Sequence, residues 1–398
     1  MVEIGRLHPT YKYMFTYICY MCTRTKAIRI VLCIIASKLL GQGLRSFLIG
    51  LDAATFLKVV GASVGVTGCF AGATALFIRN GLERHRALVP EKKANDVTDQ
   101  IILPNGRHFG YFVPDNFDPA RQTIVSIHGT PESAASLLHL GNIPEYAKLQ
   151  AELAERNVQT IAIDRWGVGL SQFHDGPVAD IASDVEALCD HLGVSKFMVG
   201  GASGAGPYMS ACAALLDPQR CVGVAMDVPI GPRDLPFHLA SDNTVAKLFN
   251  RAAWQTALVA TVQKEVLGRM TAAQFVKSVE GLPGLCENDI EAVRRDVDVF
   301  VLGLKDSKYY QHGIAAHVQE HHLMLQENWQ FDPGAMKNTH IFVGDLDVHT
   351  PIEFGHWYVS QAPEEVEMTV YKGYGHLSLY RHPNYVKDYV AFVDRCFQ

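Results

Sequence analysis

The sequence lacks a strong charge of either sign. It has 398 residues, of which 19% are charged, and its formal net charge is −6 at pH 7. Nucleic-acid-binding domains need a basic footprint, so this balance argues against DNA or RNA as a partner. Also missing are a Walker-type phosphate loop, a dinucleotide-binding glycine fingerprint and a zinc-protease helix motif. We therefore expect no cofactor.

A disulfide framework is absent as well. The nine cysteines are odd in number and scattered, and the sequence contains no Asn-x-Ser/Thr glycosylation site. This pattern is typical of reduced thiols and favours a cytoplasmic location. Cys19 and Cys22 form a Cys-x-x-Cys pair in a region without a redox-fold pattern. We interpret this pair as coincidental, or as acylation sites at most.

One long uncharged run lies near the N-terminus. The segment 59–78 is bounded by Lys58 and Arg79 and is about 20 residues long, enough for a helix to span a bilayer. Close to this segment, basic residues are denser on its C-terminal side, which by the positive-inside tendency places the following domain in the cytoplasm. The sequence predicts a single-pass membrane protein with a membrane-associated region, 1–79, and a charged linker, 80–96.

Glycines recur on one face of the expected membrane helix. They are Gly61, Gly65, Gly68 and Gly72. Small residues at helical spacing let two helices approach closely, so this face could join copies of the chain into a homo-oligomer. Glycine is also common in membrane helices without such a role, and both interpretations stay open.

The most informative run surrounds Ser203. A strand that reads as buried precedes it, an apolar helix follows, and Gly201 and Ala205 flank it at close range. A serine on a tight strand-to-helix turn needs such small neighbours, and the helix directs N–H groups toward the negative charge that develops in acyl transfer. Ser203 is therefore a candidate nucleophile, with the alternative that it only caps the helix.

A serine nucleophile needs a general base and a carboxylate that orients the base. An apolar strand at 339–344 leads to Asp347, and a strand at 366–371 leads to Gly375 and His376. Asp347 fits the spacing after its strand better than Asp345 does. We expect Asp347 as the acid and His376 as the base, in the chain order serine, acid, histidine.

Two further motifs accompany the expected triad. A β-branched strand ends in His-Gly-Thr-Pro at 128–131, and the next strand ends in Asp-Arg-Trp-Gly-Val-Gly-Leu-Ser at 164–171. Together with the triad motifs, these runs resemble the α/β-hydrolase superfamily from about residue 97 to the end of the chain. Trp166 departs from the pattern, because the family commonly carries proline or a basic residue there, and it could shape the pocket wall.

The resemblance implies roles for the residues around the expected nucleophile. The backbone N–H groups of Thr130 and Gly204 would form the oxyanion hole. His128 and Gly129 would be structural residues of the loop, because the order serine, acid, histidine already supplies a base.

The expected architecture is an α/β-hydrolase fold, with a mostly parallel sheet and helices on both faces. Its core would comprise 97–227 and 338–398. Between them, 228–337 shows apolar residues at helical spacing and no strand pattern, which predicts helices at 245–267, 271–279, 287–304 and 314–329. We expect these helices to form a cap over the active site, whose aromatic residues either line the pocket or pack the helices.

A histidine pair in the expected cap raises the question of a metal. His317 and His321 fall on one helix face, as a zinc site would require. We expect Glu320 on a different side of the helix, and no other carboxylate or cysteine nearby completes a ligand set. We therefore expect no metal at this pair.

These patterns predict a membrane-anchored serine hydrolase that cleaves an ester or thioester of an apolar small molecule or lipid through an acyl-enzyme. A serine in place of an aspartate nucleophile disfavours epoxide hydrolases and haloalkane dehalogenases, which share the His-Gly-x-Pro loop. Two alternatives stay open. The same triad could cleave an amide or carbon–carbon bond, and the chain could be a ligand receptor or scaffold with little turnover.

Overall fold

The structure is a computed structural model. It describes residues 83–239, 256–257, 260–261, 264, 269–282, 284–306 and 308–398. The expected membrane helix 59–78, with its glycines, lies outside these ranges. Among the residues within them, no helix is both long and apolar enough to cross a membrane.

One mixed sheet forms the centre of the described domain, in the strand order β1-β2-β4-β3-β5-β6-β7-β8. The strands are β1 (Asp99–Ile102), β2 (His108–Phe112), β3 (Gln122–Ile127), β4 (Val158–Ile163), β5 (Phe197–Ala202), β6 (Cys221–Asp227), β7 (Thr339–Gly344) and β8 (Val366–Tyr371). β2 pairs antiparallel with β1 and with β4, and the other neighbouring strands are parallel. The loops that follow the parallel strands therefore meet at one edge of the sheet.

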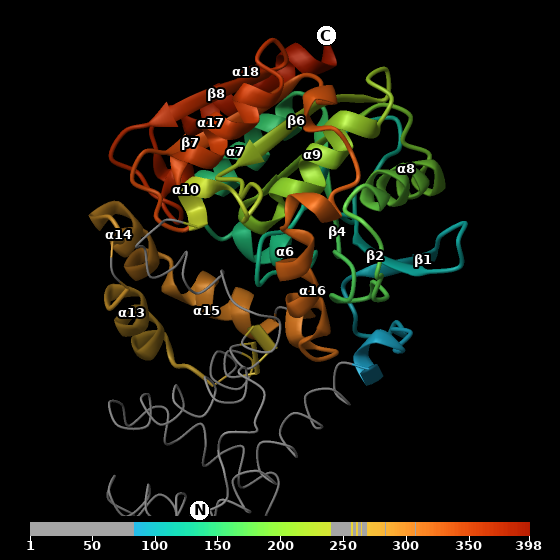
Figure 1. Ribbon diagram of the computed structural model, residues 1–398, viewed down its shortest axis with the longest axis horizontal. Coiled ribbons are helices and arrows are strands. Elements are labelled where there is room, and N and C mark those ends of the chain that lie inside the picture. The colour runs from blue at the N-terminus through green and yellow to red at the C-terminus, as the bar shows by residue number, and fades with distance from the viewer. Residues whose placement is uncertain are drawn as a thin grey trace, which may run out of the picture. The chain divides into compact units, whose positions relative to one another are not determined.

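Helices cover both faces of this sheet (Figure 1). One face packs against α8 (Asp180–Leu192), α9 (Gly206–Leu215) and α17 (Ile352–Gln361), and the other packs against α7 (Pro144–Glu155) and α18 (Tyr385–Phe397). The expected architecture of a mostly parallel sheet between two helical layers is thereby confirmed.

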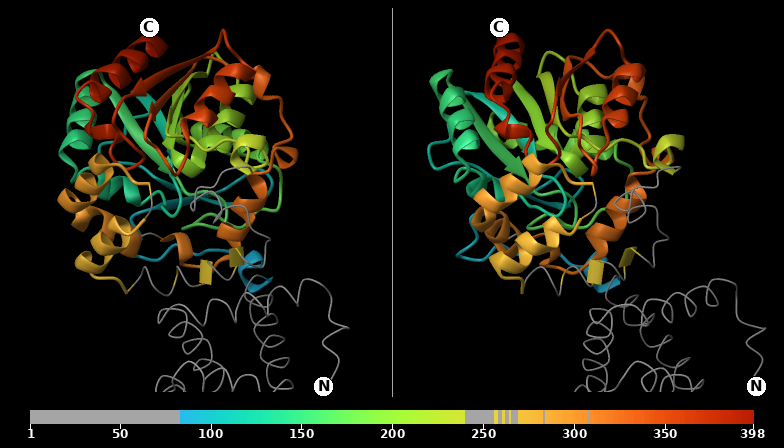
Figure 2. Two further views of the ribbon diagram at one scale, coloured as in Figure 1. Left: turned by 60° about the vertical axis from the view of Figure 1, so that its left-hand side comes forward. Right: turned by 90° about the vertical axis from the view of Figure 1, so that its left-hand side faces the viewer.

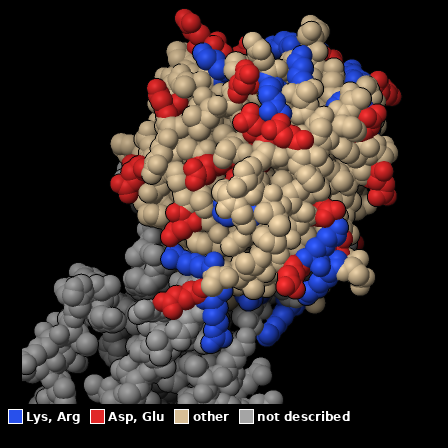
Figure 3. Space-filling model, turned by 90° about the vertical axis from the view of Figure 1, so that its right-hand side faces the viewer, with Lys and Arg blue, Asp and Glu red and all other residues tan. Residues whose placement is uncertain are grey.

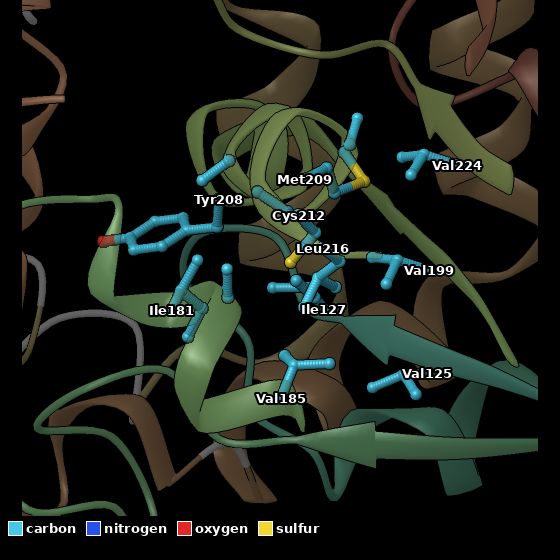
Figure 4. Packing of buried hydrophobic residues seen from close by; sticks show 14 of the residues in the cluster. Val125, Ile127, Ile181, Val185, Val199, Tyr208, Met209, Cys212, Leu216 and Val224 are labelled. Carbon is cyan, nitrogen blue, oxygen red and sulfur yellow. The ribbon is translucent and has the colours of Figure 1, made fainter. Parts of the chain in front are cut away.

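The alternation of side chains along each strand supplies both hydrophobic cores. In β3, Ile124 belongs to the cluster under α7 and α18, whereas Val125 belongs to the cluster under α8 and α9. Successive residues of a strand point to opposite faces, so an uninterrupted apolar strand fills both cores. Figure 4 shows the cluster that contains Val125, in which Met209 of α9 lies near Val224 of β6.

Between β6 and β7, the described residues form helices and no strand. The helices are α10 (Pro236–Leu239), α13 (Ala272–Glu280), α14 (Glu287–Arg295), α15 (Val297–Asp306) and α16 (Ala315–Leu323). Helices α13 to α16 lie together on one side of the sheet (Figures 1 and 2). Most of the helix expected at 245–267 lies outside the described ranges.

Two of the expected helices differ in the structure, one in its length and one in its continuity. The helix expected at 314–329 ends at Leu323, and the one expected at 287–304 divides at Asp296. The N–H of Asp296 donates to Ala292 and so closes α14, while its carbonyl accepts from Val299 at 2.9 Å and begins α15. The apolar periodicity continues across this junction, so the sequence pattern did not predict the break.

The described part of the expected linker 80–96 makes packing contacts. His85 is only 3% exposed, and its Nδ1 accepts a hydrogen bond of 3.1 Å from the N–H of Ala315, the first residue of α16. The guanidinium carbon of Arg86 lies 5.2 Å from the ring centre of Phe173. The start of the described chain is thus attached to the helical segment and to the core.

Charged side chains of both signs are interspersed on the face of the domain shown in Figure 3. On the described residues of this face, neither sign forms a broad field. A broad field of one sign would be needed to steer a large polyion toward this face.

Candidate active site

Ser203 lies at the turn between β5 and α9. It is the first residue of a short 3-10 helix, Ser203–Ala205, and its φ is 55°, a left-handed conformation that is uncommon for a residue other than glycine. Its carbonyl accepts a hydrogen bond of 3.0 Å from the N–H of Ile230, which fixes the turn. The strained backbone projects the side chain out of the end of the sheet.

Small residues make this turn possible. A Cβ on Gly201 would collide with the carbonyl oxygen of Ile127 in the neighbouring strand, and one on Gly206 would collide with the carbonyl oxygen of Ile230. Ala205 is completely buried. The sequence predicted the need for small residues at Gly201 and Ala205, and the structure adds Gly206 to them.

The structure brings Ser203, His376 and Asp347 together in a line. Oγ of Ser203 lies 3.0 Å from Nε2 of His376, and Nδ1 of His376 lies 2.8 Å from Oδ2 of Asp347. These residues follow β5, β8 and β7, which run parallel in the sheet, so all three lie at the same edge. Asp345 does not join them, because it is exposed and accepts a hydrogen bond of 2.6 Å from the N–H of Gly373.

Hydrogen-bond donors surround the Asp347 carboxylate. The N–H groups of His349 and Thr350 donate to Oδ1 at 2.8 Å and 2.9 Å, and the Thr350 hydroxyl lies 2.8 Å from Oδ2. Burial alone would raise the pKa of Asp347, but the charge of His376, with the hydrogen bonds from His376 and from the N–H of Thr350, outweighs burial and lowers the pKa below 3.8. Asp347 is therefore an anion aligned with the imidazole.

Carboxylates also set the pKa of His376. Burial alone would lower the pKa of this imidazole, but Asp347, with smaller contributions from Asp289 and Glu132, raises it above 6.5. The ring of His349 lies 4.9 Å from the ring of His376, and burial followed by the charge of His376 lowers the pKa of His349 to about 4. His376 is thus the basic imidazole of the pair, and it is the one that contacts Ser203.

The loop after β3 lies beside the serine. A Cβ on Gly129 would stand 3.5 Å from Cβ of Ser203, and a Cβ on Gly204 would collide with the hydroxyl of Thr130. Thr130 and Gly204, the residues expected to form the oxyanion hole, therefore face each other next to the nucleophile.

His128 holds this loop in place. Its Nε2 accepts from the N–H of Arg165 at 3.0 Å, so its Nδ1 carries the proton and donates to the carbonyl of Gly129 at 2.8 Å. Burial, and then the charge of Arg165, lower the pKa of His128 well below 6.5, which keeps it neutral. These contacts are those of a structural residue.

The model of the alpha/beta hydrolase fold family matches residues 122–383, a range that contains the serine turn, the acid loop and the histidine loop. This chain belongs to the α/β-hydrolase family. Comparison with curated protein sequences gave no match.

Solved structures of α/β hydrolases resemble the chain at low sequence identity. An esterase from Thermogutta terrifontis is 19% identical, with a TM-score of 0.52, over 76% of this chain and 99% of its own. A bromoperoxidase from Bacillus anthracis is 18% identical, with a TM-score of 0.53, over 75% of this chain and 99% of its own. An epoxide hydrolase from Vigna radiata is 18% identical, with a TM-score of 0.51, over 75% of this chain and 98% of its own. These similarities concern the fold.

One buried acid beside the α/β-hydrolase triad was not predicted from the sequence. Asp289 of α14 is 0% exposed, and its Oδ1 accepts from the N–H of Leu377 at 3.0 Å and from the hydroxyl of Ser378 at 2.7 Å. It thereby holds the loop that carries His376. An acidic residue in the first turn of an amphipathic helix ordinarily indicates helix stabilisation, so the sequence offered no signal of this contact.

The helix with the histidine pair is organised around hydrogen bonds. Nδ1 of His317 lies 3.0 Å from the hydroxyl of Tyr309, which also donates to Glu320, and Nδ1 of His321 lies 2.9 Å from Nη1 of Arg233. The expectation that Glu320 lies on a different side of the helix is wrong, because residues three positions apart share a helix face. Side chains that could hold a metal ion converge elsewhere in the described part of the chain, at Asp347, His349 and His376. This group overlaps the triad and does not include the histidine pair.

Trp166, the departure from the family motif, is 4% exposed and packs in the main core. Its indole N–H donates to Oδ2 of Asp184 at 2.7 Å. Asp184 also pairs with Arg107 at 2.6 Å, so the indole belongs to a buried polar group of the core.

Proposed function

We propose that this α/β hydrolase is a serine hydrolase that cleaves an ester or thioester of an apolar substrate through an acyl-enzyme. The observation that carries the proposal is the alignment of Ser203 Oγ, the His376 imidazole and the Asp347 carboxylate at 3.0 Å and 2.8 Å. The left-handed backbone of Ser203 and the raised pKa of His376 support it.

In the acylation half of the reaction, Ser203 Oγ attacks the substrate carbonyl while Nε2 of His376 takes the hydroxyl proton. The N–H groups of Thr130 and Gly204 bind the oxygen that becomes negative. When the carbon–oxygen or carbon–sulfur bond breaks, His376 returns the proton to the departing alcohol or thiol. Water then attacks the acyl-serine, His376 removes its proton, and the free acid leaves.

The serine nucleophile supports ester chemistry over epoxide opening, which in this fold proceeds through an aspartate ester. One of the similar solved structures is an esterase, and another is an epoxide hydrolase.

The apolar class of substrate rests on the sequence of the segment between β6 and β7, whose apolar residues at helical spacing predict a cap over the site. The described aromatic residues of this segment contact one another or polar side chains: the ring centres of Phe275 and Phe300 lie 6.3 Å apart, and the Tyr309 hydroxyl bonds Glu320 and His317. Phe249 and Trp254, two further aromatic residues of this segment, lie outside the described ranges.

The proposal includes an N-terminal membrane anchor at 59–78, with the hydrolase domain in the cytoplasm. Its support is the uncharged sequence between Lys58 and Arg79 and the basic residues that follow. An anchored enzyme would meet apolar esters where they concentrate, in the bilayer. Self-association through the glycine face would appear as a dimer in detergent, and a monomer would contradict it.

The test is hydrolysis of nitrophenyl esters of increasing acyl-chain length by the full-length chain in detergent. We expect turnover that rises with chain length over part of the series and that Ser203→Ala abolishes. Binding of the esters without turnover by a well-folded wild-type chain would support the receptor or scaffold alternative instead. Turnover of short acetyl esters alone would contradict the apolar substrate class.

A further inference from the structure

Arg165 is a buried cation beside the proposed oxyanion hole. Its side chain is 0% exposed, and its Nη1 donates to the carbonyl of Gly204 at 3.0 Å. Its Nη2 donates to the carbonyl of Gly129 at 3.0 Å and to the hydroxyl of Thr130 at 2.8 Å. One guanidinium thus joins the loop after β3 to the serine turn after β5.

The bond to Gly129 acts on the oxyanion donor itself. The carbonyl of Gly129 and the N–H of Thr130 belong to the same peptide unit. A hydrogen bond from a cation to the carbonyl polarises that unit and makes its N–H a stronger donor. His128 donates to the same carbonyl at 2.8 Å. The peptide unit is therefore fixed and polarised from its carbonyl side.

The counter-charge for Arg165 comes from the helices between β6 and β7. Oε1 of Glu320, on α16, lies 2.9 Å from Nη2 of Arg165, and the two side chains are 3% and 0% exposed. Oε2 of Glu320 accepts from the hydroxyl of Thr130 at 3.1 Å and also from the hydroxyl of Tyr309. Glu320 therefore contacts both the cation and a residue of the proposed hole.

We propose that Glu320 is a positioning residue for the oxyanion hole, acting through Arg165, which polarises the Gly129–Thr130 peptide unit and holds the carbonyl of Gly204. The inference rests on the proposed serine hydrolase function. A buried arginine that loses its counter-charge is strongly disfavoured. Loss of the carboxylate should therefore displace the guanidinium from the two carbonyls. The preorganisation of the hole then depends on α16 as well as on the core.

A purely structural role for the ion pair is the competing explanation. A buried pair can hold a helix to a core without affecting chemistry, and substitution would then lower stability alone. The two roles differ in their effect on transition-state binding. A trifluoromethyl ketone forms a hemiketal whose oxyanion must occupy the hole, whereas the corresponding methyl ketone binds largely without it.

The first experiment compares Glu320→Gln with wild type in the full-length chain. We expect kcat for a nitrophenyl ester to fall by about tenfold to a hundredfold, with KM within about threefold of wild type. Affinity for the trifluoromethyl ketone should fall in parallel, and affinity for the methyl ketone should not. The matched control is His322→Gln, on the exposed side of α16, which should leave all these constants and the Tm unchanged.

A double variant separates positioning from stability. Replacement of both charges in Arg165→Met/Glu320→Met removes the unpaired buried cation, so its Tm should recover relative to Glu320→Met. We expect kcat and trifluoromethyl ketone affinity to stay low in this stable double variant. Recovery of both constants together with Tm would overturn the inference, as would a normal kcat in folded Glu320→Gln. A folded wild-type chain without turnover would instead overturn the proposed function.

Discussion

Nε2 of His376 lies 3.0 Å from Oγ of Ser203, although the two residues are 173 positions apart in the chain. The parallel strands β5 and β8 carry these residues to the same edge of the sheet. Asp347 occupies the other nitrogen of the imidazole, so Nε2 is the atom that can take the serine proton. The chemistry of the site therefore depends on this alignment.

The acid position can be tested with two neighbouring aspartates. Asp347→Ala should lower kcat by about a thousandfold or more, because Nδ1 of His376 loses the partner that orients the ring. Asp345→Ala is the matched control, since Asp345 contacts the backbone of Gly373 rather than the triad. Ester kinetics on both variants provide the measurement. Equal losses of kcat in the two variants would contradict the assignment of Asp347 as the acid of the triad.

The pH profile should report the neutral form of His376. An imidazole accepts the serine proton only when it is neutral, and the pKa of His376 is raised above 6.5. We therefore expect kcat/KM to rise with pH through a value above 6.5. Asp347→Asn removes the charge that contributes most to raising the pKa of His376, whereas the effect of burial remains. The rising limb of the pH profile of kcat/KM should therefore move to lower pH, while kcat falls. An unmoved limb would assign it to another group.

Asp289 should affect both the stability of the fold and the pH at which kcat/KM rises. Asp289→Ala leaves the N–H of Leu377 without its acceptor and should destabilise the fold by about 1–3 kcal/mol, measured by denaturant unfolding. Asp289→Asn keeps an acceptor but removes a charge that raises the pKa of His376. The asparagine variant should therefore shift the limb of kcat/KM to lower pH with little loss of stability. A limb at the wild-type pH in this variant would refute an electrostatic effect of Asp289.

Gly201 should tolerate no side chain. In Gly201→Ala the new methyl group would collide with the backbone carbonyl of Ile127, which pairs with the same strand. We expect a destabilised domain and loss of turnover, with the Tm as the readout. Gly106→Ala is a useful comparison, because a Cβ there meets nothing within 4 Å and the expected cost is that of its φ of 81° alone. A smaller loss of Tm in Gly201→Ala than in Gly106→Ala would show that the close contact between Gly201 and Ile127 does not determine the stability of the turn.

The sequence predicted the parts of the site that follow strands. Ser203, Asp347 and His376 each lie in the loop that follows a strand, and parallel strands end at the same edge of the sheet whatever the connections between them. Thr130 and Gly204 were expected together for another reason, because the resemblance to the α/β-hydrolase superfamily implies an oxyanion hole at these two residues. Their common feature is local, because each was identified from a short run of neighbouring residues.

The supporting contacts of the site could not be predicted in this way. Asp289 and Glu320 stand in helices whose patterns indicate only an apolar and a polar face, yet both side chains are buried against loops of the core. Their partners depend on how the helices dock onto the sheet, which periodicity does not encode. Sequence reasoning treated Glu320 as a failed metal ligand, whereas the structure pairs it with Arg165.

The most direct test of the account is labelling of the full-length chain with a fluorophosphonate, followed by identification of the modified residue by mass spectrometry. We predict a single adduct on Ser203, no labelling of Ser203→Ala, and labelling of His376→Ala slowed by about a thousandfold or more. Absence of an adduct on a folded wild-type chain, or an adduct that persists in Ser203→Ala, would contradict the assignment of Ser203 as an activated nucleophile.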